Sequence, residues 1–245
     1  MTQLEKPYKN IHSNMLTMDV VTTIISIIVA VIVIGFIYYY FKRAAVTGNN
    51  YVIVDNTSDG KTQFDSKMLL PLSNNEDPGM AFSYACWVRI NDFGYKYGAP
   101  KVVFTKGPTD LTSMCPALLL DANTNSFIVK MDTFGGTEVI PVNNIPAKKW
   151  IHVAIAVSQS AMDIYINGTL YLHHTLVKIP RQNRETVHTA VNGGFDGQIA
   201  GLQYFRTLLG PSEVSNLMQN TPQPSQQDIN GPVPPYFDMS FWTGH

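Results

Sequence analysis

The chain has 245 residues, of which 45% are hydrophobic and 14% are charged, and its formal net charge is −1. The charged fraction is well below the roughly 25% of an average soluble domain. Nucleic-acid binding normally requires a basic face, so this near-neutral balance argues against nucleic acid as a partner.

The longest apolar run lies near the N-terminus, at residues 20–41 (VVTTIISIIVAVIVIGFIYYYF), and carries no charge. A helix of this length spans about 33 Å, enough for a hydrocarbon core of about 30 Å. A cleaved signal peptide fits poorly with the polar residues 1–19 and with the length of the run, and a core strand would be far shorter. We therefore predict a short polar N-terminus at 1–19 and a transmembrane helix at 20–41.

The flanks of this span predict its orientation. The residues that flank and anchor it are Asp19, Tyr38, Tyr39, Tyr40, Lys42 and Arg43. The tyrosines stand where an interfacial aromatic belt belongs, and the two cations directly after the span favour an outside N-terminus and a cytosolic C-terminal part. Lysines further back in the N-terminus leave the opposite orientation open.

After a linker at residues 42–50, the sequence shows many short β-patterned segments. Strands are predicted at residues 51–56, 80–90, 101–107, 117–122, 126–133, 137–142, 150–158, 162–168, 169–177 and 197–205. Turn-forming residues gather at 74–79, 121–126 and 134–136. Many short strands without helical periodicity predict an all-β, antiparallel two-sheet sandwich over residues 51–220.

The pair Asn167-Gly168 supports two interpretations. Between two β-patterned runs, Asn-Gly predicts a type I′ hairpin, because both central residues of that turn need a positive φ. Asn167-Gly168-Thr169 is also an N-glycosylation acceptor, as is the segment Asn56-Thr57-Ser58. The predicted cytosolic location favours the hairpin.

A two-residue loop also predicts the register of this hairpin. The expected pairs are Ile166 with Thr169, Ile164 with Tyr171, and Met162 with His173. Such a ladder places the apolar residues of the first strand on one face.

A helix is predicted at residues 210–220, where Ser212 can cap the helix and Glu213 is favourable near its N-terminus.

The two cysteines, Cys86 and Cys115, lie in apolar runs and show no metal-ligand spacing. Two buried thiols are favoured over one disulfide.

The tail at residues 221–245 holds five prolines and ends in an aromatic cluster. Proline-rich composition predicts an extended segment with little helix or sheet. Either its rings fold back on the sandwich or they dock on a neighbouring protein. The candidate contact residues are Tyr236, Phe237, Phe241 and Trp242.

Four segments resemble the laminin G-like, concanavalin A-like jelly-roll family: FSYACWVRI with Trp87, KVVFTKG, PAKKWIHVAIAVSQSAMDIYINGTLY, and FDGQIAGLQYFRTLLGPSEVSNLM. The most specific is Trp-x-His-Val-Ala followed by Tyr-x-Asn-Gly. Its signature residues here are Trp150, His152, Tyr165, Asn167 and Gly168. The resemblance implies a two-sheet sandwich that binds sugars, proteins or membranes and seldom catalyses.

The domain order as a whole resembles that of membrane-anchored virion or minor capsid proteins of large icosahedral DNA viruses. This likeness rests on architecture and on no motif. It implies a virion internal membrane as the location and capsid or virion proteins as partners.

The chain is predicted not to be an enzyme. The Glu-x-Asp-x-x-Glu strand of jelly-roll glycoside hydrolases is absent, and no pair of acidic residues at that spacing replaces it. His152 is interpreted as hydrogen-bonded inside the sandwich, rather than as the partner of a nucleophile. His173 and His174 point to opposite faces of a strand and are predicted to lie at the surface.

No cofactor or metal ligand is assigned. Calcium is the family's commonest ion, so its binding is possible through loop carboxylates. The available residues, each interpreted as a turn residue, are Asp110, Asp121, Asp132 and Asp196. Trp87 and Trp150 could stack on a sugar but are interpreted as packing residues.

We therefore expect a non-enzymatic, membrane-anchored structural or interaction protein whose sandwich contacts other proteins, with a virion as the location that the architectural resemblance implies. The alternative is a membrane-tethered, carbohydrate-binding lectin. A third hypothesis, a hydrolase, would need two carboxylates roughly 5–10 Å apart in one groove.

Overall fold

The computed structural model describes residue 20 and residues 22–39, 49–76 and 79–222. The chain divides into two compact units, Met1–Asn49 and Asn50–His245. The described part of the first unit contains one helix, Thr22–Tyr39, whose residues are mostly apolar and not buried. By length and composition it can cross a membrane as an anchor, and a signal sequence would meet the same test. Tyr38 and Tyr39 are exposed at its end, while Asp19, Tyr40, Lys42 and Arg43 lie outside the described residues.

The described part of the second unit is an all-β sandwich with one α-helix, α2 (Pro211–Leu217), and a short 3-10 turn at Val191–Gly193. Its strands are β1 (Asn50–Val54), β2 (Ser58–Asp59), β3 (Phe64–Asp65), β4 (Asn74–Glu76), β5 (Gly79–Asp92), β6 (Lys101–Lys106), β7 (Ala117–Leu120), β8 (Phe127–Thr133), β9 (Gly136–Val142), β10 (Trp150–Val157), β11 (Ala161–Ile166), β12 (Thr169–Thr175), β13 (Val187–Thr189) and β14 (Asp196–Phe205).

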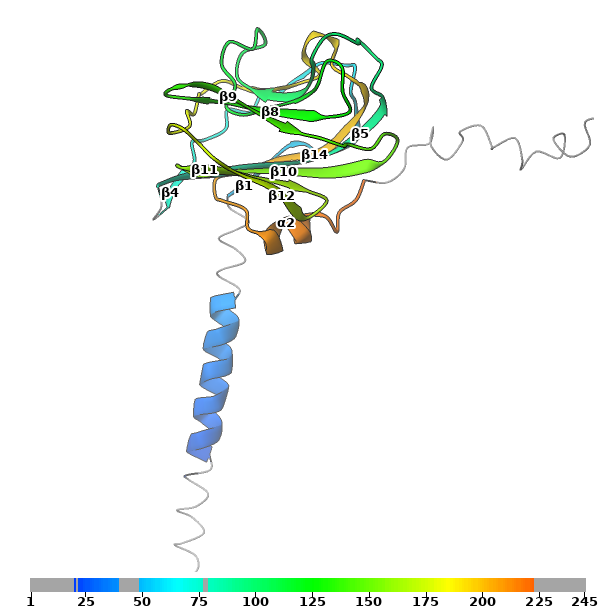
Figure 1. Cartoon of the computed structure of the whole chain (residues 1–245). Helices are drawn as coiled ribbons and strands as arrows, with labels where there is room; N and C mark the ends of the chain where they lie inside the picture. The colour runs from blue at the N-terminus through cyan, green and yellow to red at the C-terminus, as the bar shows by residue number, and fades with distance from the viewer. Residues whose placement is uncertain (1–19, 21, 40–48, 77–78, 223–245) are drawn as a thin grey trace, which may run out of the picture. The chain divides into compact units, whose positions relative to one another are not determined.

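The strands form two stacked antiparallel sheets of the jelly-roll type (Figure 1). The larger sheet runs in the order β1-β14-β5-β10-β11-β12, with β2 paired to β14 and β4 paired to β5. The smaller sheet runs in the order β3-β13-β6-β7-β8-β9. The first and the last strand of this unit, β1 and β14, are neighbours in the larger sheet although they are distant in sequence.

All ten predicted strands are present, with ends shifted by a few residues. The sequence missed β2, β3, β4 and β13, because strands of two or three residues are too short to show an alternating pattern. The strand β4 also narrows the turn predicted at residues 74–79, since Asn74–Glu76 pairs with β5 and the chain reverses between Glu76 and Gly79.

The main core lies between the sheets, and β10 shows how the sequence fills it. Val153, Ile155 and Val157 belong to this core, whereas Ala154 and Ala156 belong to a second buried cluster on the outer face of the larger sheet. The alternation confirms the predicted period of two. Both faces of β10 are therefore covered, and Ala154 and Ala156 place small side chains on its outer face.

Helix α2 supplies part of that outer cover, because its Val214 packs in the outer cluster. Its N-terminus differs from the prediction. Gly210 occupies the N-cap, Pro211 begins the helix, and the Gly210 N–H donates to Glu213 Oε2 at 2.7 Å. Ser212 therefore lies inside the first turn and caps nothing, since a proline at the first helical position places the cap before it.

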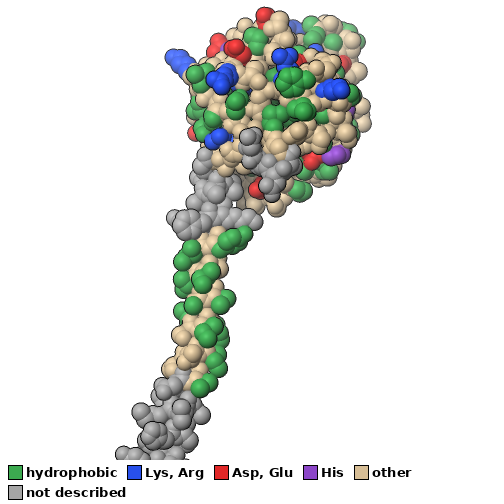
Figure 2. Space-filling view, turned by 90° about the vertical axis from the view of Figure 1, so that its left-hand side faces the viewer, with side chains coloured by type: hydrophobic (Ala, Val, Ile, Leu, Met, Phe, Trp, Pro, Cys, Tyr) green, Lys and Arg blue, Asp and Glu red, His purple; other side chains and the backbone are tan. Residues whose placement is uncertain are grey.

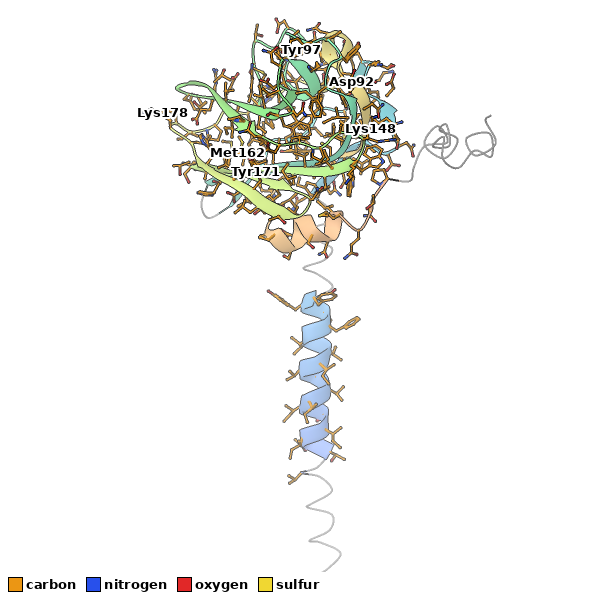
Figure 3. The ribbon with its side chains drawn as sticks, turned by 45° about the vertical axis from the view of Figure 1, so that its right-hand side comes forward. Asp92, Tyr97, Lys148, Met162, Tyr171 and Lys178 are labelled. Atoms are coloured by element: carbon orange, nitrogen blue, oxygen red, sulfur yellow. The ribbon has the colours of Figure 1, made fainter. Side chains whose placement is uncertain are left out.

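The Asn167-Gly168 turn forms as predicted, with φ values of 48° and 78°. The register is right only for its first pair, Ile166 with Thr169. A β-bulge follows, in which Ile164 pairs with Leu172 rather than with Tyr171. The extra residue on β12 is Tyr171, which is 45% exposed and whose hydroxyl accepts from the Asn143 N–H at 3.0 Å, whereas Met162 is buried inside the sandwich (both labelled in Figure 3).

The bulge shifts the remaining ladder by one residue, so Met162 pairs with His174 and not with His173.

The prediction of two buried thiols is confirmed, because Cys86 and Cys115 are both buried and free.

Candidate functional site: a pocket on the outer face of the larger sheet

A cavity of about 400 Å³ opens on the outer face of the larger sheet, between the sheet and the C-terminal end of α2. Ligand pockets in proteins typically enclose about 300–1,000 Å³. Its lining comes from five parts of the chain that are distant in sequence: the segment after β1, the strands β5, β10 and β14, and the end of α2 with the residues after it.

The floor of the cavity is made of small residues, Ala85, Ala200 and Gly201. Between Ala200 and Gln203 the pairing of β14 with β5 shifts by a β-bulge. Gly201 sits in this bulge with a φ of 57°, a conformation that side-chain-bearing residues rarely adopt. The bulge and the missing side-chain volume together leave the hollow open.

One wall is formed by Trp87 on β5 and His152 on β10, which are paired in the sheet. The two rings meet edge to face, with centroids 5.1 Å apart and planes inclined by 63°. Adjacent residues Cys86 and Val88 face the main core, so Trp87 faces away from it. The tryptophan that the sequence assigned to core packing is therefore a pocket wall, although it is largely buried.

The interpretation that the His152 side chain is hydrogen-bonded inside the sandwich is wrong. It is only 2% exposed, yet its Nδ1 has no hydrogen-bond partner among the described residues. Its hydrogen bonds are made by the backbone, whose N–H donates to Asn167 Oδ1 at 2.9 Å and whose carbonyl accepts from the Asn167 N–H. Burial lowers the pKa of His152 to about 4, so the ring is neutral at pH 7.

The mouth of the cavity is polar. Asp55, Asn56 and Thr57 are exposed there, and their side chains make no hydrogen bond to any described residue. Gln203 contributes its amide, whose Oε1 accepts from Asn50 Nδ2 at 3.0 Å. Among the described residues that line the cavity, Asp55 is the one carboxylate, and there is no lysine or arginine.

Sequence reasoning found Trp87 and His152 but missed the rest of this lining. Asn56 and Thr57 were identified only as part of an N-glycosylation acceptor, and only the tertiary fold brings the residues of the mouth together. The one available signal was the isolated glycine in the strand GQIAGLQYF, because a glycine inside a strand pattern often marks a bulge.

The remaining signature residues lie elsewhere. Trp150 is half-buried at the start of β10 and pairs with Arg89. Tyr165 is buried in the outer cluster, and burial raises the pKa of its phenol. Gly168 packs against α2, where an added Cβ would lie 2.5 Å from Met218 Sδ. The aromatic residues Tyr236, Phe237, Phe241 and Trp242 lie outside the described residues.

The two consecutive histidines on β12, His173 and His174, contact different carboxylates. His173 Nδ1 lies 2.5 Å from Asp163 Oδ1, and His174 Nε2 lies 2.7 Å from Glu138 Oε2. This arrangement agrees with the prediction that the two rings point to opposite faces.

Asp110 and Asp121 lie in loops as interpreted, whereas Asp132 lies in β8 and Asp196 begins β14, which corrects the turn interpretation for these two. All four carboxylates contact neighbouring groups. Asp110 accepts from Thr112, Asp121 from Asn123 and Thr124, Asp132 from Met114 and Thr137, and Asp196 pairs with Lys61. No group of three or more His, Cys, Asp or Glu in the described part of the chain is placed to hold a metal ion.

A second surface feature is an apolar tip where the β8–β9 turn meets residues 177–181. Phe134 and Val177 are 74% and 79% exposed, and the Phe134 N–H donates to the Ile179 carbonyl at 3.0 Å. The Arg181 guanidinium lies 5.5 Å from the Phe134 ring centroid. Figure 2 shows hydrophobic side chains beside Lys and Arg on this side of the molecule, and Figure 3 labels Lys178 at this edge.

With this geometry established, the chain can be compared with known proteins. The sequence model of the concanavalin A-like lectin/glucanases superfamily, of the laminin G type, matches residues 47–215. The chain belongs to this family. A comparison with curated protein sequences finds no match.

The solved structures similar to this chain include receptor-binding proteins. A structure of botulinum neurotoxin type C, whose cell entry depends on two ganglioside molecules, matches with a TM-score of 0.53 and 16% identity over 72% of this chain and 52% of that one. The serotype D ligand-binding domain in complex with N-acetylneuraminic acid matches with a TM-score of 0.52 and 12% identity over 71% and 42%. This chain spans about half the length of these proteins, and the likeness establishes the jelly-roll fold alone.

Proposed function

We propose that this protein is a non-catalytic, single-pass membrane protein that presents its laminin G-like sandwich to partner proteins. The observation that carries the proposal is the unburied apolar helix Thr22–Tyr39 on the same chain as a sandwich of a binding-domain family. A charge-free helix of this length is stable when lipid surrounds it, because every backbone polar group is bonded within the helix. The lack of the hydrolase carboxylate motif supports a binding role.

The apolar tip supports protein contacts in particular. Phe134, Val177 and Ile179 expose apolar surface together, and contiguous exposed apolar surface often marks an interaction site. Arg181 beside them adds a charge-bearing edge of the kind that protein interfaces favour. We extend the proposal to a virion with an internal membrane, where the partner is a shell protein, on the strength of the domain order.

Protease protection on sealed membranes tests the topology. With the sandwich on the cytosolic side, protease added to that side digests it and leaves a fragment the size of the anchor. Endoglycosidase treatment then causes no mass shift, because neither Asn167 nor Asn56 meets the glycosylation machinery. Full protection from the cytosolic side, or a mass shift, contradicts this orientation.

Crosslinking in intact membranes or particles tests the protein contact. The double variant Phe134→Ser/Val177→Ser should lose a crosslinked partner that the wild type captures, since two exposed apolar anchors are removed. Tyr97→Ser is the matched control, because Tyr97 is exposed at another loop (Figure 3). Equal capture by all three proteins would show that the tip is not the contact surface, and a wild type without any partner would refute the proposed function.

A second candidate function is a membrane-tethered lectin, and the pocket beside Trp87 and His152 favours it. The superfamily includes lectins, and the structures similar to this chain are named for ganglioside and sialic acid binding. Saturable binding to a glycan array, measured with and without calcium, tests this candidate. A glycan array without signal in either condition removes it.

A further inference from the structure

We propose that the pocket beside Trp87 and His152 is a binding site for one uncharged, polyhydroxylated ring, such as a neutral monosaccharide unit. The inference rests on the second candidate function and adds to it a location and a ligand class. Three observations carry it: the built shape of the cavity, its unpartnered polar groups, and its charge.

The shape is produced by the sheet and does not depend on a loose loop. Ala85, Ala200 and Gly201 keep the floor low, and the bulge of β14 is held by backbone pairing with β5 on both sides. Leu217 and Asn220 close the opposite side at the end of α2. A volume of about 400 Å³ accommodates a single sugar ring with its first hydration waters.

The polar groups match a ligand that both donates and accepts hydrogen bonds. Neutral His152 has one nitrogen that donates and one that accepts, and its buried Nδ1 has no partner in the described part of the chain. Asp55, Asn56 and Thr57 add unoccupied acceptors and donors at the mouth. Trp87 adds an aromatic surface against which the C–H face of a ring can pack.

The charge of the lining selects against acidic ligands. Asp55 is its one ionised group, and neither Lys nor Arg is among the described lining residues. The ring of His152 is neutral at pH 7, so it offers no cation. A carboxylate or phosphate would meet repulsion here without a counter-charge. The ligand class therefore differs from N-acetylneuraminic acid, an acidic sugar.

The experiment uses the full chain in phosphatidylcholine nanodiscs, because alkyl glycoside detergents would compete for the site. Saturation-transfer NMR titrations with glucose, galactose, mannose, N-acetylglucosamine and N-acetylneuraminic acid measure Kd. We expect saturable binding of at least one neutral sugar and at least about tenfold weaker binding of N-acetylneuraminic acid, since an unpaired buried charge costs more than a lost neutral hydrogen bond.

Variants locate the site. Asp55→Ala should weaken the neutral sugar about three- to tenfold, as expected for the loss of one hydrogen bond. Trp87→Leu should weaken it at least about tenfold through the lost aromatic contact. Asp110→Ala and Trp150→Leu are matched controls outside the pocket and should leave Kd unchanged. Asp55 is exposed, so its variant tests the site even if Trp87→Leu fails to fold.

The outcomes separate the inference from the function on which it rests. Neutral sugar binding that neither variant affects leaves the lectin function standing and overturns this location. Preference for N-acetylneuraminic acid overturns the ligand class. Binding that occurs only after removal of residues 223–245 identifies the tail as the natural occupant and also overturns the inference. No binding of any sugar refutes both the inference and the lectin candidate.

Discussion

The stability of the sandwich should fall between pH 6.5 and pH 4 because of His152 alone. Burial of this ring in the pocket wall lowers its pKa from the ordinary 6.5 to about 4. Between these two values the unfolded chain holds a proton on His152 and the folded chain does not. The contribution of neutral His152 to the free energy of unfolding is therefore fully present above pH 6.5 and is lost as the pH falls towards the folded pKa.

The magnitude follows from the two pKa values. Each pH unit between them is worth about 1.4 kcal/mol, so the total loss attributable to His152 is about 3 kcal/mol. This is a large part of the 5–15 kcal/mol that is typical of a folded domain. Hydrogen bonds lower the pKa of Asp65, Asp110 and Asp121 below the ordinary 3.8, so the stability that these carboxylates contribute is lost only at more acidic pH.

The assay is urea unfolding of the full chain in phosphatidylcholine nanodiscs at a series of pH values from 7.5 to 4, followed by tryptophan fluorescence. His152→Gln replaces the ring by an amide that does not titrate, and its stability should be nearly independent of pH in this window. His173→Gln is the matched control, because His173 is exposed and pairs with Asp163 outside the pocket. Parallel pH profiles for the wild type and His152→Gln would refute the reasoning.

Two further predictions concern the hairpin and the thiols. Gly168→Ala should destabilise the protein by about 1 kcal/mol more than Gly98→Ala: both glycines have a positive φ, but only at Gly168 does the new Cβ meet Met218, while at Gly98 it meets nothing within 4 Å. Urea midpoints measure the difference, and equal losses would contradict the contact. Cys86 and Cys115 should react with a thiol reagent only after denaturation, since both are buried and burial raises the pKa of each thiol. Rapid labelling of the native protein would contradict this prediction.

Much of the fold follows from local patterns in the sequence. The ten main strands alternate polar and apolar residues or form short apolar runs, and these patterns survive folding because each strand packs at least one face against the core. The sequence also predicts the turn at Asn167-Gly168, since few other residue pairs accept a positive φ at both positions. The sequence does not predict the strand register beyond this turn, because the bulge at Tyr171 depends on how β12 twists over its neighbour and not on the turn.

In contrast to the fold, most of the candidate site could not be predicted from local patterns in the sequence. Trp87 and His152 belong to the family signature, but nothing local indicates that Asp55, Gln203 and Asn220 meet them in one cavity. Their positions depend on the pairing of β14 with β5, which joins segments more than 100 residues apart.

The sequence by itself determined that a charge-free apolar helix precedes a sandwich of short strands, because hydrophobic length and period are local properties of the chain. Only the tertiary structure decided where the sandwich opens a pocket, since the bulge at Gly201, the small floor residues and the cover by α2 arise from long-range pairing. It also decided the state of His152, because the pKa and hydrogen bonds of a side chain depend on the neighbours that the fold places around it.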